Sequence, residues 1–177
     1  DLEKLRAMAE KGCNPNYLSE FTFPKTLTCH EDLQQVLKAD YIFIAVPSHG
    51  FHDCLALIKP HLHPKSSILW GSKGFAKRQL LHEVARDVLG DKIPLAILSG
   101  PSFAKEVAKA LPTAVTIAAD DLAYAKSLAK LFHSVTFRPY VTTDVIGVEV
   151  GGVVKNVLAI ATGISDGLGY GANARAA

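Results

Sequence analysis

Lys155 is the side chain in this sequence whose neighbours best suit a proton-transferring group. It stands alone in an apolar stretch, and helical spacing would place Gly151, Gly152 and Ala159 one turn away on its own face. Residues this small let another molecule approach closely. A lysine that loses water in such surroundings gives up its proton more readily, which suits general acid and base catalysis. The alternative is a lysine that extends from the edge of a buried helix into water.

A second lysine directly follows a predicted strand, in the run Trp70-Gly71-Ser72-Lys73-Gly74. Ligands of open α/β folds bind at the edge where the strands end, and two glycines would let a ligand approach the backbone closely. The same run also fits an ordinary strand-to-helix turn with a solvated lysine. We therefore expect Lys73 at the ligand edge of a sheet, with its role left open.

A third run, Ser99-Gly100-Pro101-Ser102, also follows a predicted strand. Proline at a first helical position would leave free backbone N–H groups at the same edge, where an anionic ligand could bind. Alternatively, Ser99 or Ser102 simply caps the following helix.

Histidine and cysteine side chains gather in one part of the chain, and both are good zinc ligands. They are His49, His52, Cys54, His61 and His63. Their spacing matches no structural zinc motif, so we predict no metal site. The three cysteines are odd in number and lack a CxxC spacing, which indicates free thiols in a reducing, cytoplasmic compartment.

Composition excludes several classes of protein. The formal net charge of the 177 residues is only +2, without the basic stripe typical of nucleic-acid binding. A membrane-spanning helix needs roughly 18 apolar residues without charges. The stretch from Ile146 to Ile164 contains Glu149 and Lys155, so we predict a buried helix there and no membrane span.

The elements that must position these residues alternate between short apolar runs and charged, helix-favouring runs, which indicates an α/β fold. Predicted strands cover Tyr41–Val46, Ser67–Trp70, Leu95–Leu98, Ala114–Ala118 and Val135–Tyr140. Predicted helices cover Asp53–Ile58, Arg78–Leu89, Phe103–Ala110 and Leu122–Phe132. The run Tyr41–Val46 is continuously apolar, as a strand of a parallel sheet buried on both faces would be.

After Thr143 one long apolar helix, Val145–Ile164, is predicted with no further strand. We therefore predict a Rossmann-like, doubly wound, mostly parallel sheet in residues 1–143, and the start of an all-helical domain in residues 144–177. The sequence begins within a helical pattern without Met, so we expect a fragment. The segment Lys11–Pro24 is expected to be an ordered surface loop.

Three long stretches resemble bacterial NAD(P)-dependent glycerol-3-phosphate dehydrogenases: Leu98–Val107, Asp144–Asn156 and Gly163–Arg175. Shorter agreement at Asn16–Leu18, Phe23–Pro24, Ala45–Ser48 and Ser72–Gly74 extends the resemblance over nearly the whole chain. It implies an oxidoreductase that uses NAD or NADP to interconvert glycerol 3-phosphate and dihydroxyacetone phosphate and serves glycerophospholipid synthesis. A homodimer is compatible with the resemblance.

The resemblance also implies roles for particular residues. Lys155 would be the catalytic lysine and would contact substrate, Lys73 would contact substrate and cofactor, Gly100 and Ser102 would line the substrate site, and Ala104 would touch the dinucleotide. Many relatives carry Thr where Ser102 stands. The glycine-rich first βα turn and a later Arg-Asn pair that holds the substrate phosphate are absent from the sequence.

Two other interpretations remain open. One is a related dehydrogenase that acts on a 3-hydroxy acid or a sugar acid. The other is a ligand- or metal-binding module that keeps the fold without turnover, because fold alone does not determine function.

Overall fold

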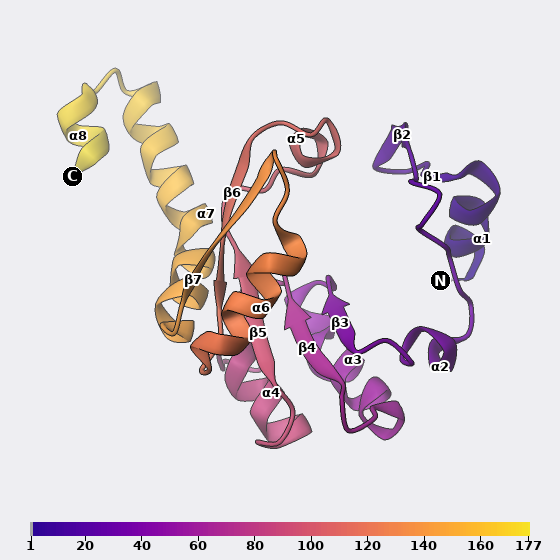
Figure 1. The fold of residues 1–177 in the computed structure, drawn as a ribbon. Helices are drawn as coiled ribbons and strands as arrows, with labels where there is room; N and C mark the ends of the chain where they lie inside the picture. The colour runs from indigo at the N-terminus through magenta and orange to yellow at the C-terminus, as the bar shows by residue number, and fades with distance from the viewer. Residues whose placement is uncertain (1) are drawn as a thin grey trace.

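The computed structural model describes residues 2–177. Its centre is a sheet of five strands in the order of the chain, which Figure 1 shows as a twisted layer. The strands are β3 (Tyr41–Ile44), β4 (Ser67–Trp70), β5 (Leu95–Ser99), β6 (Thr113–Ala118) and β7 (Phe137–Thr142). All neighbouring strands pair in parallel except β5 and β6, which are antiparallel. The predicted mostly parallel sheet is confirmed.

The central strands are buried on both faces, whereas the edge strand β3 is not. Every residue of β4 and β5 is buried, as continuously apolar strands between helix layers should be. In β3, Ile42 and Ile44 are buried, but Tyr41 and Phe43 remain about half exposed. The expectation that this strand is covered on both faces was therefore wrong for the described residues.

Helices lie on both faces of the sheet, as a Rossmann-like fold requires. They are α3 (Phe51–Ile58), α4 (Leu81–Leu89), α5 (Ala104–Ala108), α6 (Leu122–Phe132) and α7 (Val145–Gly167), with the short turns η1 (Ser48–Gly50) and η2 (Lys59–His61) flanking α3. One core joins α3, α4 and the start of α7 to one face, and a second joins α6 to the other. Alternation in β4 divides the cores, because Ile68 and Trp70 enter the first and Leu69 enters the second.

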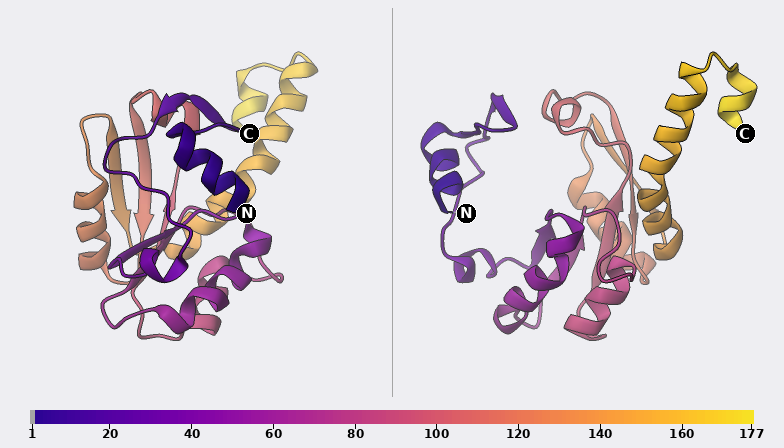
Figure 2. Two further views of the ribbon diagram at one scale, coloured as in Figure 1. Left: turned by 90° about the vertical axis from the view of Figure 1, so that its right-hand side faces the viewer. Right: turned by 180° about the vertical axis from the view of Figure 1, so that it is seen from behind.

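The N-terminal residues form a small unit that stands apart from the main sheet on the side of β3 (Figure 2). It contains α1 (Leu2–Lys11), the hairpin strands β1 (Cys13–Asn14) and β2 (Leu18–Thr22), and α2 (Leu33–Val36). The predicted loop over Lys11–Pro24 is thus partly a β-hairpin. An exposed ion pair of 2.6 Å between Arg6 and Glu31 holds two segments of this unit together, and one of 3.4 Å between Glu20 of β2 and Lys105 of α5 joins the unit to the rest of the chain.

Several element boundaries differ from the sequence-based expectation. Helix α4 begins at Leu81, not at Arg78, because Lys77 and Arg78 adopt positive φ angles of 51° and 68° in a turn before it. Helix α5 ends at Ala108, since Ala110 also has a positive φ of 55°. Strand β7 begins two residues after Val135, which is fully exposed.

Helix α7 leaves the sheet after its first turns and ends beside α8 (Ala172–Ala176), to which Asp166 and Arg175 join it at 2.6 Å (Figure 1). Its buried residues are Val145 and Glu149, so the expectation of a buried helix was wrong over most of its length. By length and composition α7 could cross a membrane, but a single such helix is weak evidence because helices of soluble proteins pass the same test.

Candidate active site

A cavity of about 370 Å³ lies between α7 and the edge where β4 and β5 end. It is lined by Lys73, Ser99, Gly100, Pro101, Thr116, Gly147, Val148, Gly151, Gly152 and Lys155. The cavity therefore brings together three of the predicted site residues, Lys73, Gly100 and Lys155, from three separate segments of the chain. We call it the two-lysine cavity.

Lys73 is held at the cavity wall by the turn after β4. Its Nζ donates a hydrogen bond of 3.1 Å to the carbonyl oxygen of Gly100, in the turn after β5. The preceding Ser72 is buried, and its hydroxyl donates to the carbonyl of Val46 at the end of the neighbouring strand. Partial loss of solvent lowers the pKa of Lys73, and the positive charge of Lys155 lowers it further. The two lysines thus act on each other electrostatically.

Lys155 lies on the opposite wall, carried by α7. Its Nζ stands 4.8 Å from the centre of the Phe103 ring, a cation–π arrangement. The side chains of Lys155 and Lys73 are both exposed, and it is for Lys73 that partial loss of solvent lowers the pKa. Gly152 lets the helix lie close to the sheet, because a Cβ there would lie 3.3 Å from Ser99 Oγ and 3.6 Å from Lys73 Cγ.

Gly100 occupies a position that only glycine fits. Its φ is 150°, and a Cβ there would lie 2.9 Å from the Cα of Val115 on the adjacent strand β6. The turn after β5 can therefore press against β6 and present the Gly100 carbonyl to Lys73. This carbonyl also accepts a bond of 3.4 Å from the Ser102 hydroxyl.

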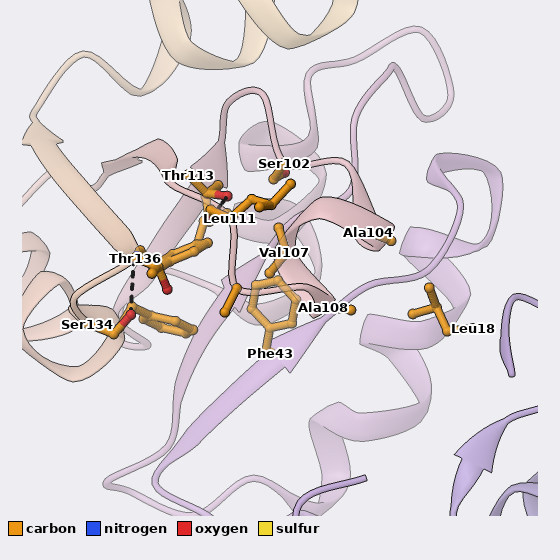
Figure 3. Close-up of a pocket in the computed structure, with 14 residues that line it drawn as sticks. Leu18, Phe43, Ser102, Ala104, Val107, Ala108, Leu111, Thr113, Ser134 and Thr136 are labelled. Carbon is orange, nitrogen blue, oxygen red and sulfur yellow. Dashed lines mark hydrogen bonds between the residues drawn. The ribbon is translucent and has the colours of Figure 1, made fainter. Parts of the chain in front are cut away.

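Ser102 and Ala104 lie outside the two-lysine cavity. A second cavity of about 320 Å³ is lined by Phe43, Ala45, Val46, Pro47, Gly71, Ser72, Lys73, Leu98 and Ser102. A third, of about 640 Å³, opens between β3, α5 and β7, and Figure 3 shows Ser102 and Ala104 on its wall. Lys73 lines both the first and the second cavity, and Ser102 lines both the second and the third, so the three cavities are neighbours.

The serine-capping interpretation and the helix start at Pro101 were both wrong. Helix α5 begins at Ala104, and its N-cap residue is Phe103, which makes no side-chain capping bond. Ser99 instead ends strand β5 facing α7, and Ser102 bonds to Gly100. Both serines are therefore free of the helix start and belong to the cavity walls.

The histidines and Cys54 do not form a metal site. Among residues 2–177, no group of three or more His, Cys, Asp or Glu side chains has a metal-binding arrangement. His52 pairs with Asp53 at 3.0 Å, and His63 lies 3.7 Å from Asp40. Cys54 and the other two cysteines are free.

Sequence reasoning missed Phe103 and Thr116 as part of the site. Phe103 is an aromatic residue just before a helix, and an aromatic ring in such a position can contact a cation or a ligand. This signal could have identified Phe103, whose side chain is 62% exposed in the structure. Thr116 lies in the middle of β6, and its place on the cavity wall depends on the antiparallel pairing of β5 with β6. No local pattern reveals that pairing.

A site of this shape suits a small anionic substrate that undergoes proton transfer. Two lysines converge on one cavity at the ligand edge of an open α/β sheet, where opposing charge would be bound from two sides. A lysine within reach of a reacting oxygen can exchange a proton with it. The neighbouring apolar cavity, which shares Lys73, offers room for a second ligand.

Comparison with known proteins finds relatives over nearly the whole chain. Residues 1–125 match the family model described as NAD-dependent glycerol-3-phosphate dehydrogenase N-terminus, and residues 144–177 match the model of its C-terminus. The glycerol-3-phosphate dehydrogenase [NAD(P)+] of Bartonella henselae is 51% identical over 99% of this chain and 53% of its own length. That of Methylococcus capsulatus is 48% identical over the same shares.

Solved structures show the same likeness in three dimensions. The glycerol-3-phosphate dehydrogenase of Coxiella burnetii matches with a TM-score of 0.89 and 47% identity, over 98% of this chain and 54% of that one. The enzyme of Saccharomyces cerevisiae matches with a TM-score of 0.84 and 29% identity, over 98% of this chain and 52% of that one.

The chain spans about half the length of the curated relatives it matches. The two family models nevertheless account for most of its residues, on both sides of the junction between β7 and α7. The chain therefore belongs to the NAD-dependent glycerol-3-phosphate dehydrogenase family.

Proposed function

We propose that the full-length protein interconverts sn-glycerol 3-phosphate and dihydroxyacetone phosphate with NAD or NADP. The observation that carries this proposal is the two-lysine cavity, in which Lys73 and Lys155 face one space with the Gly100 carbonyl between their segments. The substrate is a small phosphorylated ketone or alcohol, so it needs both anion binding and proton transfer. Two lysines on opposite walls supply these two functions.

The residues present fit a nicotinamide dinucleotide beside that cavity. The second cavity has mainly apolar walls and lies at the carboxyl ends of β3 and β4. Gly71 and Phe43 both line it, and a Cβ on Gly71 would lie 2.9 Å from the Phe43 ring, so the glycine lets this ring pack against the turn after β4. When bound, the nicotinamide supplies or accepts the hydride at C2 of the substrate. Lys73 borders both cavities and would contact both ligands.

We assign Lys155 the proton transfer. In the direction of ketone reduction, its ammonium group donates a proton to the oxygen on C2, and in oxidation its neutral amine removes that proton. Lys73 orients the substrate and stabilises negative charge as it develops on the same oxygen. Gly100 and Ser102 line the substrate side. Ala104, on the wall of the third cavity, contacts the dinucleotide.

We also propose that residues 1–143 belong to the dinucleotide-binding domain and residues 144–177 begin the helical substrate-binding domain. The junction is the N-cap of α7, where Asp144 accepts a 2.8 Å bond from the Gly147 N–H. The exposed apolar residues of α7, such as Leu158, Ile160 and Ile164, need a covering layer. Further helices of the same domain would cover them, and a homodimer is the other arrangement we consider.

We place the enzyme in the cytoplasm, with glycerophospholipid synthesis as the use of its product. Three free cysteines support a reducing compartment. The charge of +2 and the absence of a basic stripe from the sequence give no support for a nucleic-acid partner.

The test uses the full-length protein with dihydroxyacetone phosphate and follows oxidation of NADH and NADPH in parallel. We expect turnover with at least one of the two cofactors, and much weaker turnover with a panel of 3-keto acids and sugar acids. Turnover of a hydroxy-acid pair in preference to dihydroxyacetone phosphate would contradict the proposal. So would binding of the cofactor without turnover of any substrate.

A further inference from the structure

The 23-residue helix α7 has two buried side chains, the apolar Val145 and the charged Glu149. Both of its carboxylate oxygens are bonded to a single residue of another helix, His82 in α4. Oε1 accepts from the His82 backbone N–H at 3.0 Å, and Oε2 lies 2.5 Å from His82 Nδ1. The Glu149 side chain is 3% exposed and that of His82 is 24% exposed.

The bonds between Glu149 and His82 satisfy polar groups of both helices. His82 is the second residue of α4, so its backbone N–H has no partner within its own helix and is available to Glu149. A carboxylate at a helix N-terminus is also favoured by the helix dipole. Burial raises the pKa of Glu149, while the hydrogen bonds and charge of His82 act in the opposite direction. A buried carboxyl group at this point would be costly without these bonds.

The pair lies where the first turns of α7 pack against the sheet. Val145, Glu149 and Gly152 are spaced four and three residues apart, so they lie on the one face of α7 that meets the sheet. Beyond Glu149, the described part of α7 has no buried side chain. Lys155 lies on this more exposed part of α7, less than two turns beyond Glu149.

The pair also borders the site directly. Glu149 lines a gap too narrow for water together with Lys73, Ser99 and Gly152. The turn bearing Lys73 and the helix bearing Lys155 are therefore in contact around the Glu149 carboxyl group. A shift of the Glu149 side chain would therefore change the distance between the Lys73 turn and α7, which form walls of the two-lysine cavity.

We propose that Glu149 and His82 are positioning residues that set the place of Lys155 opposite Lys73. The pair fastens α7 to the start of α4, and the rigid helix transmits that placement to the lysine. The catalytic consequence of this inference rests on the proposed dehydrogenase function. The structural consequence, a fastened α7, does not.

The test compares three variants of the full-length protein. Glu149→Gln keeps two hydrogen-bonding atoms and can satisfy His82 after a change of imidazole tautomer. Glu149→Leu keeps the volume and removes both bonds, and His82→Ala removes only the bond to Nδ1. A displacement of about 1 Å at a reacting group can cost about a hundredfold in rate. We expect a loss of kcat of that order for Glu149→Leu, a smaller loss for His82→Ala, and activity within a few fold of wild type for Glu149→Gln, with little change in KM for the cofactor.

A second readout does not depend on activity. Hydrogen exchange should be faster for backbone amides 150–156 in Glu149→Leu and His82→Ala than in wild type or Glu149→Gln, while amides of strand β5 keep their protection. Unchanged exchange in this segment would overturn the inference, and so would equal losses of kcat in Gln and Leu. If wild type fails to turn over dihydroxyacetone phosphate but the exchange pattern holds, the proposed function fails and the fastening of α7 stands. His82→Ala removes a partly exposed side chain, so it serves if Glu149→Leu does not fold.

Discussion

Lys73 donates a 3.1 Å hydrogen bond to the carbonyl oxygen of Gly100, and this bond joins the turn after β4 to the turn after β5. Both turns lie at the ligand edge of the sheet, and both line the cavity that Lys155 closes from the other side. The backbone at Gly100 therefore determines where the Lys73 ammonium group points.

Gly100→Ala should impair both folding and substrate binding. A Cβ at φ 150° is strained, and it would lie 2.9 Å from the Val115 Cα. Strain of this kind costs about 1–3 kcal/mol. Denaturant unfolding should show this loss, and KM for dihydroxyacetone phosphate should rise. Gly163→Ala is the matched control: a Cβ there meets no other described atom within 4 Å, and helical Ala is favoured over Gly by about 0.5–1 kcal/mol. Equal stability of the two variants would contradict this account.

Phe103→Leu should weaken catalysis modestly without unfolding the protein. The ring lies 4.8 Å from Lys155 Nζ and is 62% exposed, so its removal takes away a cation–π contact but little core packing. Such contacts contribute about 0.5–1 kcal/mol at exposed sites, which corresponds to a change in kcat/KM of about two- to fivefold. Phe103→Tyr retains a ring and should stay near wild type. A Leu variant with wild-type kcat/KM would show that the contact does not hold Lys155 in its working position.

The dependence of stability on pH should report the environment of Lys73. Its pKa is lowered from the ordinary 10.5, so between the lowered value and 10.5 the folded protein binds fewer protons than the unfolded chain. Stability contributed through this group therefore rises with pH across that window. The unfolding free energy of wild type minus that of Lys73→Met should increase as the pH rises from neutral toward 10.5. A difference that stays constant or falls would mean that Lys73 is not desolvated.

Much of the fold could be predicted because its patterns are local. The buried strands β4 and β5 read as continuous apolar runs, and the bounds of α6, Leu122–Phe132, follow from its Asp121 cap and its apolar stripe. The predictions were wrong where tertiary contacts determine the exposure or the pairing of a strand. The half-exposed faces of Tyr41 and Phe43 depend on what lies beside the edge strand, and the hairpin strands β1 and β2 are too short for a clear alternation.

The site was predictable in its residues but not in its geometry. Lys73, Gly100 and Lys155 were expected, and the structure places them on one cavity. The exposure of these side chains to solvent was not predictable, because it depends on which segments of the chain pack against each other. The helical pattern showed small residues near Lys155, but not that one of them, Gly152, would lie close to the Lys73 side chain. The bonds of Glu149 to His82 span 67 positions in the sequence, and no periodicity indicates such a pair.

The measurement that tests the central claim most directly is the turnover of dihydroxyacetone phosphate by full-length Lys155→Ala, beside wild type and beside Lys126→Ala. Lys126 is an exposed lysine of α6, on the opposite face of the sheet. General acid–base catalysis contributes about a hundredfold or more to rate, so kcat should fall by at least that factor in Lys155→Ala and stay near wild type in Lys126→Ala. Wild-type turnover in Lys155→Ala would contradict the assignment of proton transfer to this residue.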